Sequence, residues 1–429
     1  MKIVFITPVT PFIDGGTSAH IYHLTLGRSN DVEMDIYTFN NNNRTPEEIK
    51  VVEEQLNVRI HIIKMPLWIR LLFMFHLSII RVFLKFPIYY YLKVDKKTTD
   101  EIEEKRPDGI WIYGEELASV TRQFPNYRRV HTLPDSEAMY FYRMIQQRFV
   151  TKHPMTYWKN ILMYKKYVCM EQHYDNHPSI TYHLVGQADA DFISNNNPGI
   201  DARFIRHPHY HILDKNRTIK FHNPKIKLLI AGQYNHYMKQ SADELLQFIC
   251  NEDENENGLR TKTRNEDERS AMPLCTFRSK NYLKEHYVFT FLGKGWEKHA
   301  ETMKRAGYEV NHIRFAENYQ EELVKHDIQI TPIAIGTGTK GKVLDALANG
   351  LMVIGTSYAM ENIAVKNGES CIEYNTPEEV VKVLMDIPEN IQKYEQIAEL
   401  GRKQVLTIHS RSNVSKQLFG IFQEQSKEQ

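Results

Sequence analysis

The sequence has few cysteines and no long apolar run. Its four cysteines are spread over 429 residues, and no two of them have the C-x-x-C spacing of a zinc or redox motif. No stretch reaches about 18 apolar residues without a charge, so a membrane-spanning helix is not predicted. The N-terminal run Met1–Ile6 is too short for a signal peptide. These absences favour a protein of the reducing cytoplasm that has no disulfide framework.

An excess of charge of either sign is also absent. The 54 Lys and Arg residues balance 53 Asp and Glu residues, and the resulting net charge of +1 gives no reason to expect a nucleic-acid partner. With 42% hydrophobic residues the chain can bury a core. Its length is sufficient for two domains of about 200 residues each.

Short β-branched runs alternate with longer helical patterns in two successive series. This alternation predicts two doubly wound α/β domains with parallel sheets, in which ligands lie beyond the carboxyl ends of the strands. The Pro- and His-rich residues 205–224 between the series predict a linker, and the charged residues 251–270 predict a surface insertion. The expected strands are Ile3–Thr7, Met34–Thr38, Val58–Ile63, Gly109–Tyr113, Arg129–Thr132, Lys227–Ala231, Val288–Leu292, Glu309–Ile313, Ile328–Pro332 and Leu351–Thr356.

The sharpest local signal is a strand, a glycine-rich loop and a helix within residues 328–350. Glycines allow the backbone to approach a ligand closely, and the free N–H groups at the start of the helix attract anions. Lysines in the loop add positive charge. The pattern predicts a phosphate-binding loop, although the glycines could also serve only to make a tight turn. The residues concerned are Gly336, Gly338, Lys340, Gly341 and Lys342.

Residues 336–342 also match G-x-x-x-x-G-K, the beginning of a nucleotide-triphosphatase P-loop. That motif needs a Ser or Thr at the next position, where the hydroxyl binds Mg²⁺, and this chain has Val343 there. The loop also lies late in the chain, after a strand that contains Pro332. We therefore favour a phosphate site of another kind.

From Thr331 to Ile363 the sequence TPIAIGTGTKGKVLDALANGLMVIGTSYAMENI strongly resembles the donor-binding core of the family 4 glycosyltransferases. In that family the segment reads P-x-x-x-G-x-G-x-K-x-K-x-x-E-A-x-A-x-G-x-P-V-V-x-T-x-x-x-x-E. The resemblance implies the GT-B fold, in which two Rossmann-like domains face each other across a cleft. Residues 1–210 would bind the acceptor and residues 220–405 the nucleotide-sugar, and a helix within 406–429 would pack back on the first domain.

Two acidic residues eight positions apart hold the donor in this family. Asp345 stands at the second position, where its carboxylate can accept two hydrogen bonds from the ribose hydroxyls. The first position is Thr337, which can bond a sugar hydroxyl but carries no charge. Glu361 matches a further acidic position, either as a donor ligand or as a helix-capping residue. The resemblance also places the donor against Gly15, Gly16, Gly232, Gly336, Gly338 and Thr339.

The diphosphate of the donor is clamped in this family by an Arg and, six residues later, a Lys. The corresponding residues here are Gln233 and Lys239, so one of the two cations is missing. Lys340, or the helix amides after Gly338, would then neutralise more of the charge on the leaving diphosphate. The resemblance makes Lys239 and Lys340 candidate catalytic residues, although an isolated lysine such as Lys239 is also typical of a solvated surface.

His131 stands where many family members carry a histidine that faces the cleft. It could bond the transferred sugar, or it could be a strand-end histidine satisfied by the backbone. Three further histidines, at 207, 209 and 211, alternate and would share a face if they lay on a strand. Because they lie in the expected linker and no second ligand cluster accompanies them, a metal site is not predicted.

Two stretches contain no acidic residue and are rich in basic and aromatic residues. Residues 64–93 carry five basic residues, and residues 138–170 carry six. On a helix, Arg70, Arg81 and Lys85 would fall within about 60° of one another, which is typical of a helix at a membrane surface. The pattern predicts peripheral contact with anionic lipids on the cytoplasmic face of the membrane. The alternative is a pair of buried helices whose basic ends reach water.

The resemblance implies a retaining, metal-independent glycosyltransferase of the hexosyl type. It would move a sugar from a nucleoside diphosphate sugar to a hydroxyl of a lipid-linked or polysaccharide acceptor, and would need no cofactor beyond this donor. Thr337 and Gln233 depart from the family pattern, so a nucleotide-sugar-binding protein that has lost catalysis stays an alternative. A nucleotide-sugar epimerase of the same fold is the other.

Overall fold

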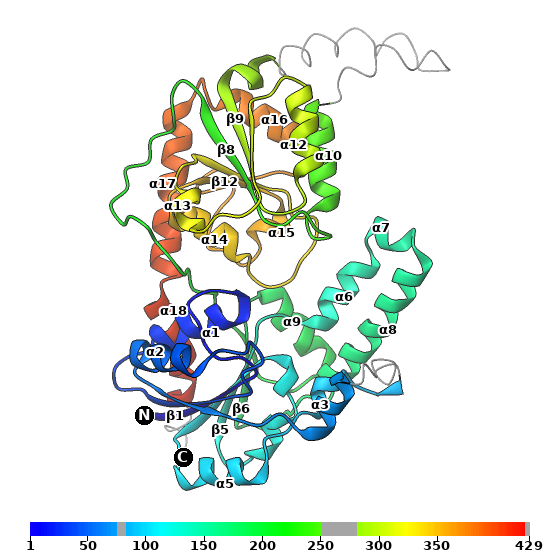
Figure 1. Ribbon diagram of the computed structural model, residues 1–429, viewed down its shortest axis with the longest axis vertical. Coiled ribbons are helices and arrows are strands. Elements are labelled where there is room, and N and C mark those ends of the chain that lie inside the picture. Colours follow the sequence, from blue (N-terminus) through cyan, green and yellow to red (C-terminus); the bar gives the residue numbers. More distant parts are fainter. Residues whose placement is uncertain (75–82, 251–280, 425–429) are drawn as a thin grey trace. The chain divides into compact units, whose positions relative to one another are not determined.

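The structure is a computed structural model that describes residues 1–74, 83–250 and 281–424. It has two compact units, each built on one parallel sheet with helices on both faces (Figure 1), and the predicted α/β class is thereby confirmed. The first unit comprises residues 1–210, 337–339 and 409–429, and the second comprises 211–336 and 340–408. The predicted surface insertion at 251–270 lies outside the described residues, as does Arg81 of the first basic stretch.

The first unit has a seven-stranded sheet of order β3-β2-β1-β4-β5-β6-β7. Its strands are β1 (Lys2–Thr7), β2 (Glu33–Thr38), β3 (Arg59–Ile62), β4 (Gly109–Tyr113), β5 (Arg128–Leu133), β6 (Ile180–Leu184) and β7 (Ala202–Phe204). Its helices are α1 (Gly16–Leu26), α2 (Pro46–Leu56), α3 (Leu67–Met74), η1 (Ile88–Tyr91), α5 (Lys96–Glu104), η2 (Glu115–Leu117), η3 (Val120–Gln123), α6 (Glu137–Ile145), α7 (Arg148–Thr151), α8 (Pro154–Glu171), α9 (Gln187–Asn196) and α18 (Arg411–Glu424).

Strand β1 shows why this sheet is covered on both faces. Ile3 and Phe5 point to one core, which also contains side chains of α1 and α18, whereas Val4 and Ile6 point to the other, with side chains of α3 and α5. All four side chains are fully buried. A strand that is buried on both faces has a continuous apolar sequence, which is why β1 could be recognised without alternation of polar residues.

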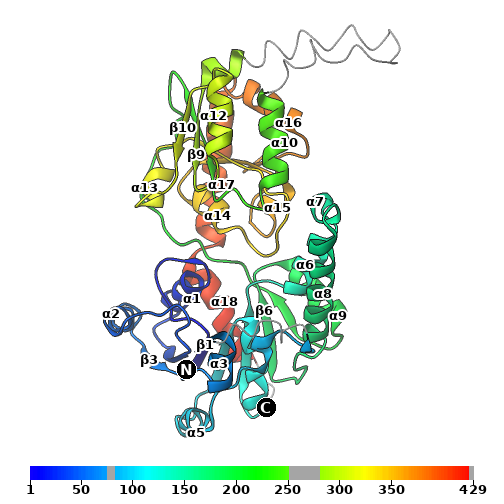
Figure 2. The same ribbon diagram turned by 45° about the vertical axis from the view of Figure 1, so that its right-hand side comes forward.

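The last helix, α18, belongs to the first unit and lies beside α1 (Figures 1 and 2). Its Ser415 hydroxyl donates a hydrogen bond of 2.8 Å to the carbonyl oxygen of Leu24. A Cβ at Gly27, just after α1, would lie 2.5 Å from the carbonyl oxygen of Arg411, so the close approach of the two helices requires glycine there. The two ends of the chain thus share one core.

The second unit has a six-stranded sheet of order β10-β9-β8-β11-β12-β13. Its strands are β8 (Ile226–Ala231), β9 (Tyr287–Leu292), β10 (Val310–Ile313), β11 (Ile328–Thr331), β12 (Met352–Gly355) and β13 (Ile372–Glu373). Its helices are α10 (Lys239–Cys250), α12 (Glu297–Arg305), α13 (Tyr319–Leu323), α14 (Gly341–Ala348), α15 (Ser357–Met360), α16 (Pro377–Asp386) and α17 (Ile391–Ile408). All ten predicted strands are present, each within one residue of its predicted ends.

Both sheets reverse their strand order at one point, between β1 and β4 in the first unit and between β8 and β11 in the second. The loops that leave the carboxyl ends of such strands diverge to opposite faces of the sheet and leave room for a ligand. The loops after β8 and β11 begin at Gly232 and Pro332, so the predicted phosphate loop lies at the switch point of the second sheet.

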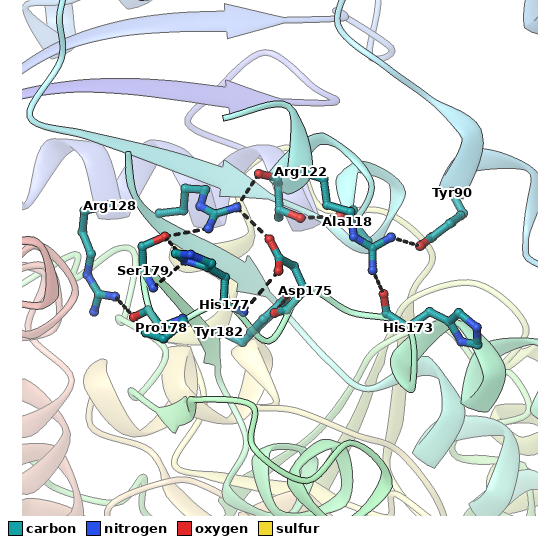
Figure 3. A network of polar contacts seen from close by, with 12 residues as sticks. Tyr90, Ala118, Arg122, Arg128, His173, Asp175, His177, Pro178, Ser179 and Tyr182 are labelled. Carbon is teal, nitrogen blue, oxygen red and sulfur yellow. Dashed lines mark hydrogen bonds and ion pairs between the residues drawn. The ribbon is translucent and has the colours of Figure 1, made fainter. Parts of the chain in front are cut away.

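A polar network in the first unit fixes the amino end of β5 (Figure 3). It therefore lies at the opposite end of this strand from the carboxyl end, where a ligand is expected. Arg129, the second residue of β5, is fully buried and donates from Nη1 to Asp175 Oδ2 at 2.7 Å and from Nη2 to Ser179 Oγ at 2.6 Å. In the same network Arg122 donates to the hydroxyl of Tyr90 at 3.0 Å. These bonds tie the segment after α8 to the sheet, so the network has a structural role.

Candidate functional site

Three loops of the second unit converge at the carboxyl end of its sheet. The backbone N–H of Ala334, in the loop after β11, donates to the carbonyl oxygen of Tyr237, in the loop after β8, at 2.8 Å. The Thr356 hydroxyl, after β12, donates to the carbonyl oxygen of Ile333 at 2.6 Å. The site residues that the sequence predicted in this unit lie on these loops, or on or directly after the helices that follow them: Gly232, Gln233, Lys239, Gly336, Lys340, Asp345 and Glu361.

Lys340 and Glu361 form an ion pair within this group of loops. Lys340 Nζ lies 3.9 Å from Glu361 Oε2, and the two side chains are 13% and 19% exposed. A Cβ at Gly336 would lie 2.9 Å from Cε of Lys340, so the lysine stem runs directly over this glycine. Thr356 caps the N-terminus of α15, and Glu361 follows the end of this helix. Lys340 therefore points along the loop and not into bulk solvent.

Asp345 lies on α14, half-buried, beside two residues that it affects electrostatically. The ammonium of Lys342 lies 4.4 Å from the centre of the Tyr319 ring. Desolvation lowers the pKa of Lys342, and the Asp345 carboxylate opposes this shift. Burial, together with the same carboxylate, raises the pKa of the Tyr319 hydroxyl. The sequence analysis did not identify Tyr319. This residue follows the loop after β10, at the carboxyl end of a predicted strand, and that position could have marked it as a candidate site residue.

The remaining predicted residues of the second unit are more exposed. Gln233 and Lys239 both have exposed side chains, and Lys239 is the first residue of α10. Val343, the residue that departs from the P-loop motif, is fully buried in the core. A residue at this position has no hydroxyl and could not reach a bound ion, which agrees with the rejection of a P-loop.

Residues 337–339 at the middle of the glycine-rich loop belong to the first unit. The backbone N–H of Gly338 donates to Asp189 Oδ2 at 3.1 Å, and the hydroxyl of Thr339 donates to the carbonyl oxygen of Val185 at 2.7 Å. Gly338 has a φ of +58°, a conformation that favours glycine. Thr337 is half-buried in the same segment.

In the first unit, Gly15 and Gly16 begin α1 after the end of β1. Gly15 is the N-cap with a φ of +86°, and the position of a Cβ at Gly16 has no atom within 4 Å. His131 lies inside β5, fully buried, and donates from Nε2 to the carbonyl oxygen of Gly114 at 2.8 Å. Burial lowers the pKa of His131 to about 4, so the ring is neutral at pH 7. This hydrogen bond is the one expected if His131 is a strand histidine that is satisfied by the backbone.

A group of carboxyl residues that the sequence analysis did not single out gathers near the carboxyl ends of β4 and β5. Ser136 donates from its backbone N–H to Asp189 at 2.9 Å and from its hydroxyl to Glu171 at 2.8 Å. Burial, reinforced by neighbouring carboxylates, raises the pKa of Glu137 to about 7 and that of Glu171 to about 8. The same causes raise the pKa of Glu115 well above its usual value.

The alternating histidines of the expected linker do not lie on a strand. Residues 205–225 have no helix or strand, and His207 stacks on His20 with ring centres 4.4 Å apart. The backbone N–H of His209 donates to the carbonyl oxygen of His409 at 2.9 Å. Within residues 1–74, 83–250 and 281–424, no three His, Cys, Asp or Glu side chains are arranged to hold a metal ion.

Comparison with known proteins identifies the fold. Residues 274–420 match the family described as glycosyl transferase-like, and no curated protein matches the chain. Similar solved structures include HepE of Anabaena in complex with UDP-glucose, with a TM-score of 0.58, 11% identity and 100% of both chains covered. Sucrose-phosphate synthase from Thermosynechococcus elongatus has a TM-score of 0.60, 10% identity and 100% of both chains covered.

A third similar structure is WaaG, a glycosyltransferase involved in lipopolysaccharide biosynthesis. It has a TM-score of 0.55 and 12% identity, with 97% of this chain and 100% of that chain covered. The likeness in each case extends over nearly the whole of both chains, so it includes both units of this chain. The chain therefore has the two-unit α/β fold of the GT-B glycosyltransferases, and over residues 274–420 it matches the glycosyl transferase-like family.

Proposed function

We propose that this chain is a retaining glycosyltransferase that moves a sugar from a nucleoside diphosphate donor to a hydroxyl of a lipid-linked or polysaccharide acceptor. The observation that carries the proposal is the convergence of the loops after β8, β11 and β12 at the switch point of the second sheet. This edge presents glycine backbone, two lysines and the start of α14, which together suit a diphosphate. Asp345, on α14, suits the ribose hydroxyls.

The similar structures support this donor and acceptor class. HepE was solved with UDP, with UDP and glucose, and with UDP-glucose. WaaG is involved in lipopolysaccharide biosynthesis, which is consistent with an acceptor that is lipid-linked. We propose the same classes of donor and acceptor for this chain.

The chemistry proposed for the site needs charge stabilisation more than proton transfer by the protein. In front-face attack the departing diphosphate receives the proton of the acceptor hydroxyl, so no protein side chain has to act as general base. The residues that hold the diphosphate then lower the barrier by stabilising the charge that grows on it. Lys340, held by Glu361 beside Gly336, has the burial and the partner that this role requires.

A panel of UDP-, GDP- and dTDP-sugars tests the proposed function. Thermal-shift measurements identify the donor that binds, and release of the nucleoside diphosphate then measures turnover. A specific shift followed by transfer or slow donor hydrolysis supports the transferase. A shift without turnover toward any acceptor supports the binding protein that Thr337 and Gln233 suggest, and interconversion of the sugar without release supports an epimerase.

Replacing Asp345 by alanine should weaken donor binding by about 1.5 to 3 kcal/mol, because a charged hydrogen bond to the ribose is lost. The side chain is half-buried on a helix surface, so the variant should fold. Titration calorimetry with the donor measures the effect. Asp345→Glu, which restores the carboxylate, serves as the matched control, and an unchanged affinity of a folded Asp345→Ala variant would remove this residue from the site.

Activity should survive chelation, because lysines and helix amides are proposed to hold the diphosphate. Turnover in EDTA should stay within about twofold of turnover in Mg²⁺, since no step of the proposed chemistry uses an ion. The initial rate of diphosphate release in the two buffers is the measurement. Loss of turnover in EDTA that Mn²⁺ or Mg²⁺ restores would contradict this part of the proposal.

Helix α8 gives structural support for the proposed membrane contact. Met155, Trp158 and Leu162 form an apolar stripe along it and are 87%, 66% and 38% exposed, and the exposed lysines 159 and 165 lie on the same face. Figures 1 and 2 show α8 packed along α6, so the stripe lies on the side that α6 leaves uncovered. No helix in the part of the chain that the structure describes is long and apolar enough to cross a bilayer.

The double variant Met155→Glu, Trp158→Glu should lower binding to anionic vesicles about 100-fold, because two apolar side chains no longer enter the interface and two negative charges approach it. Sedimentation with vesicles of phosphatidylglycerol and phosphatidylcholine measures the bound fraction. Val51→Glu, at a 50% exposed position on α2, is the matched control and should bind like the wild type. Equal binding of all three proteins would remove α8 from the proposed membrane face.

A further inference from the structure

A carboxylate ties the loop after β8 to two helices of the second unit. Tyr234, the third residue of this loop, donates from its hydroxyl to Asp243 Oδ1 at 2.6 Å. His299 donates from Nε2 to the same carboxylate oxygen at 2.9 Å. Asp243 lies on α10 and His299 on α12, so one carboxylate oxygen joins the loop to both helices.

The ring and the backbone of Tyr234 are held as well. Its ring packs against those of Trp296 and His299, with ring centres 5.1 and 4.7 Å apart. Its backbone N–H donates to the carbonyl oxygen of Lys294 at 2.9 Å. The buried Trp296 donates from Nε1 to the carbonyl oxygen of Gly232 at 2.8 Å. The loop backbone is therefore fixed on both sides of the residue between Gly232 and Tyr234.

Two glycines after β9 bring the neighbouring loop into direct contact with this backbone. A Cβ at Gly293 would clash with the carbonyl oxygen of Gly232, and a Cβ at Gly295 would lie 3.2 Å from the Cβ of Tyr234. Both glycines have a positive φ, +138° and +93°, which favours glycine. Because the two loops pack this closely, a shift of Tyr234 would also move the backbone at Gly232.

The hydrogen bonds of Asp243 are placed to select a loop conformation more than to add stability. The side chains of Asp243 and His299 are 31% and 18% exposed, so water can replace these bonds in part. The loop that they hold begins at the switch point, where Gln233 is exposed. A ligand binds more tightly to a loop that is already ordered, because less conformational entropy is lost on binding.

We propose that Asp243 is a positioning residue that acts through the Tyr234 hydroxyl and holds the backbone of Gly232 and Gln233 in the conformation that binds the nucleoside diphosphate. This assignment rests on the proposed function, because it takes a nucleoside diphosphate as the ligand of the loop after β8. Asp243 makes no contact with the donor in this assignment. Its loss should therefore lower affinity by releasing the loop, and a residue that keeps the acceptor oxygen should restore affinity.

Titration calorimetry with UDP, GDP and dTDP tests the assignment, and thermal unfolding is measured alongside. The wild type should bind at least one of the three diphosphates. Asp243→Ala should weaken that diphosphate about 10-fold, because only a fraction of the free protein then has the competent loop. Tyr234→Phe, which lacks only the hydroxyl, should weaken it in the same direction. Asp243→Asn keeps Oδ1 as an acceptor and should bind within about threefold of the wild type.

Asp386→Ala is the matched control, because it removes the same kind of bond elsewhere in this unit. The hydroxyl of Tyr394 on α17 donates to Asp386 Oδ2, at the end of α16, at 2.7 Å. This variant should lose as much thermal stability as Asp243→Ala and should bind the diphosphate like the wild type.

Unchanged diphosphate affinity of a folded Asp243→Ala variant, or of Tyr234→Phe if the first variant does not fold, overturns this assignment alone. An equal loss of affinity in Asp386→Ala does the same, because the effect would then be one of general stability. Failure of the wild type to bind any of the three diphosphates overturns the proposed function, and this assignment with it.

Discussion

Replacing Lys340 by alanine should lower kcat about 100- to 1000-fold and change donor affinity much less. Charge on the diphosphate grows as the glycosidic bond breaks, so a cation held in place stabilises the transition state more than the ground state. The structure gives Lys340 this preorganisation, because its side chain is only 13% exposed and its ammonium lies 3.9 Å from the Glu361 carboxylate. Steady-state kinetics with a saturating donor separates kcat from binding.

A second lysine of the same unit provides the control for this prediction. Lys366 also forms an ion pair, with Glu369, but its side chain is 70% exposed and the pair lies outside the convergent loops. Lys366→Ala should therefore leave kcat unchanged. A small and equal effect of both substitutions would show that Lys340 does not stabilise the leaving diphosphate, although the fold and the donor site would be unaffected.

Replacing Glu171 by glutamine should abolish most of the fall in stability that the wild type undergoes between pH 6.5 and pH 8. Glu171 is 1% exposed, and burial raises its pKa from 4.5 to about 8. The folded protein therefore keeps a proton that the unfolded chain releases, so the free energy of unfolding falls as the pH rises toward 8. Over this range the loss is about 2 kcal/mol for one such group.

Buried histidines have the opposite dependence and act in a lower range. Burial lowers the pKa of His131, His183 and His207 to about 4, so their contribution to stability is complete above pH 6.5 and is lost between pH 6.5 and pH 4. Between pH 6.5 and pH 8 the change in stability therefore comes from the buried carboxyl groups and not from these histidines. Glu137, whose pKa is raised to about 7, contributes in the same direction as Glu171.

Urea unfolding at pH 6.5 and pH 8 measures this difference. Glutamine keeps the Oε1 acceptor that Ser136 and the backbone of Ala138 use, so the variant should be about as stable as the wild type at pH 6.5. Glu54→Gln, at an exposed position on α2, should leave the pH dependence unchanged. A wild type that is equally stable at both pH values would show that Glu171 is ionised in the folded protein.

The sequence was sufficient to predict the strands that are buried on both faces. Gly109–Tyr113 and Ile328–Thr331 have continuous apolar or β-branched sequences, and such runs are recognisable without any tertiary information. The strands that were not predicted lack this feature. β6 contains Thr181 and His183, whose polar groups are satisfied by partners on neighbouring segments, such as Arg128 and Thr132 on β5, and β13 has two residues.

The candidate site was predictable where its residues are close in sequence, as in the loop from Gly336 to Asp345. Contacts between distant segments were not. Tyr319 and Lys342 are 23 positions apart, and only the parallel sheet brings the end of the β10 loop against the first turn of α14. The carboxyl residues around Glu171 likewise lie on four different helices, so no local sequence pattern could predict their raised pKa values.

Hydrogen–deuterium exchange with and without a saturating nucleoside diphosphate sugar tests the central claim most directly, which is that the donor binds at the switch point of the second sheet. Binding should slow exchange in peptides covering residues 232–239 and 333–345, the loops after β8 and β11. Peptides of α16 and the first half of α17, which lie outside these loops, should exchange at an unchanged rate. Saturating binding that protects neither of the two loops would contradict the claim.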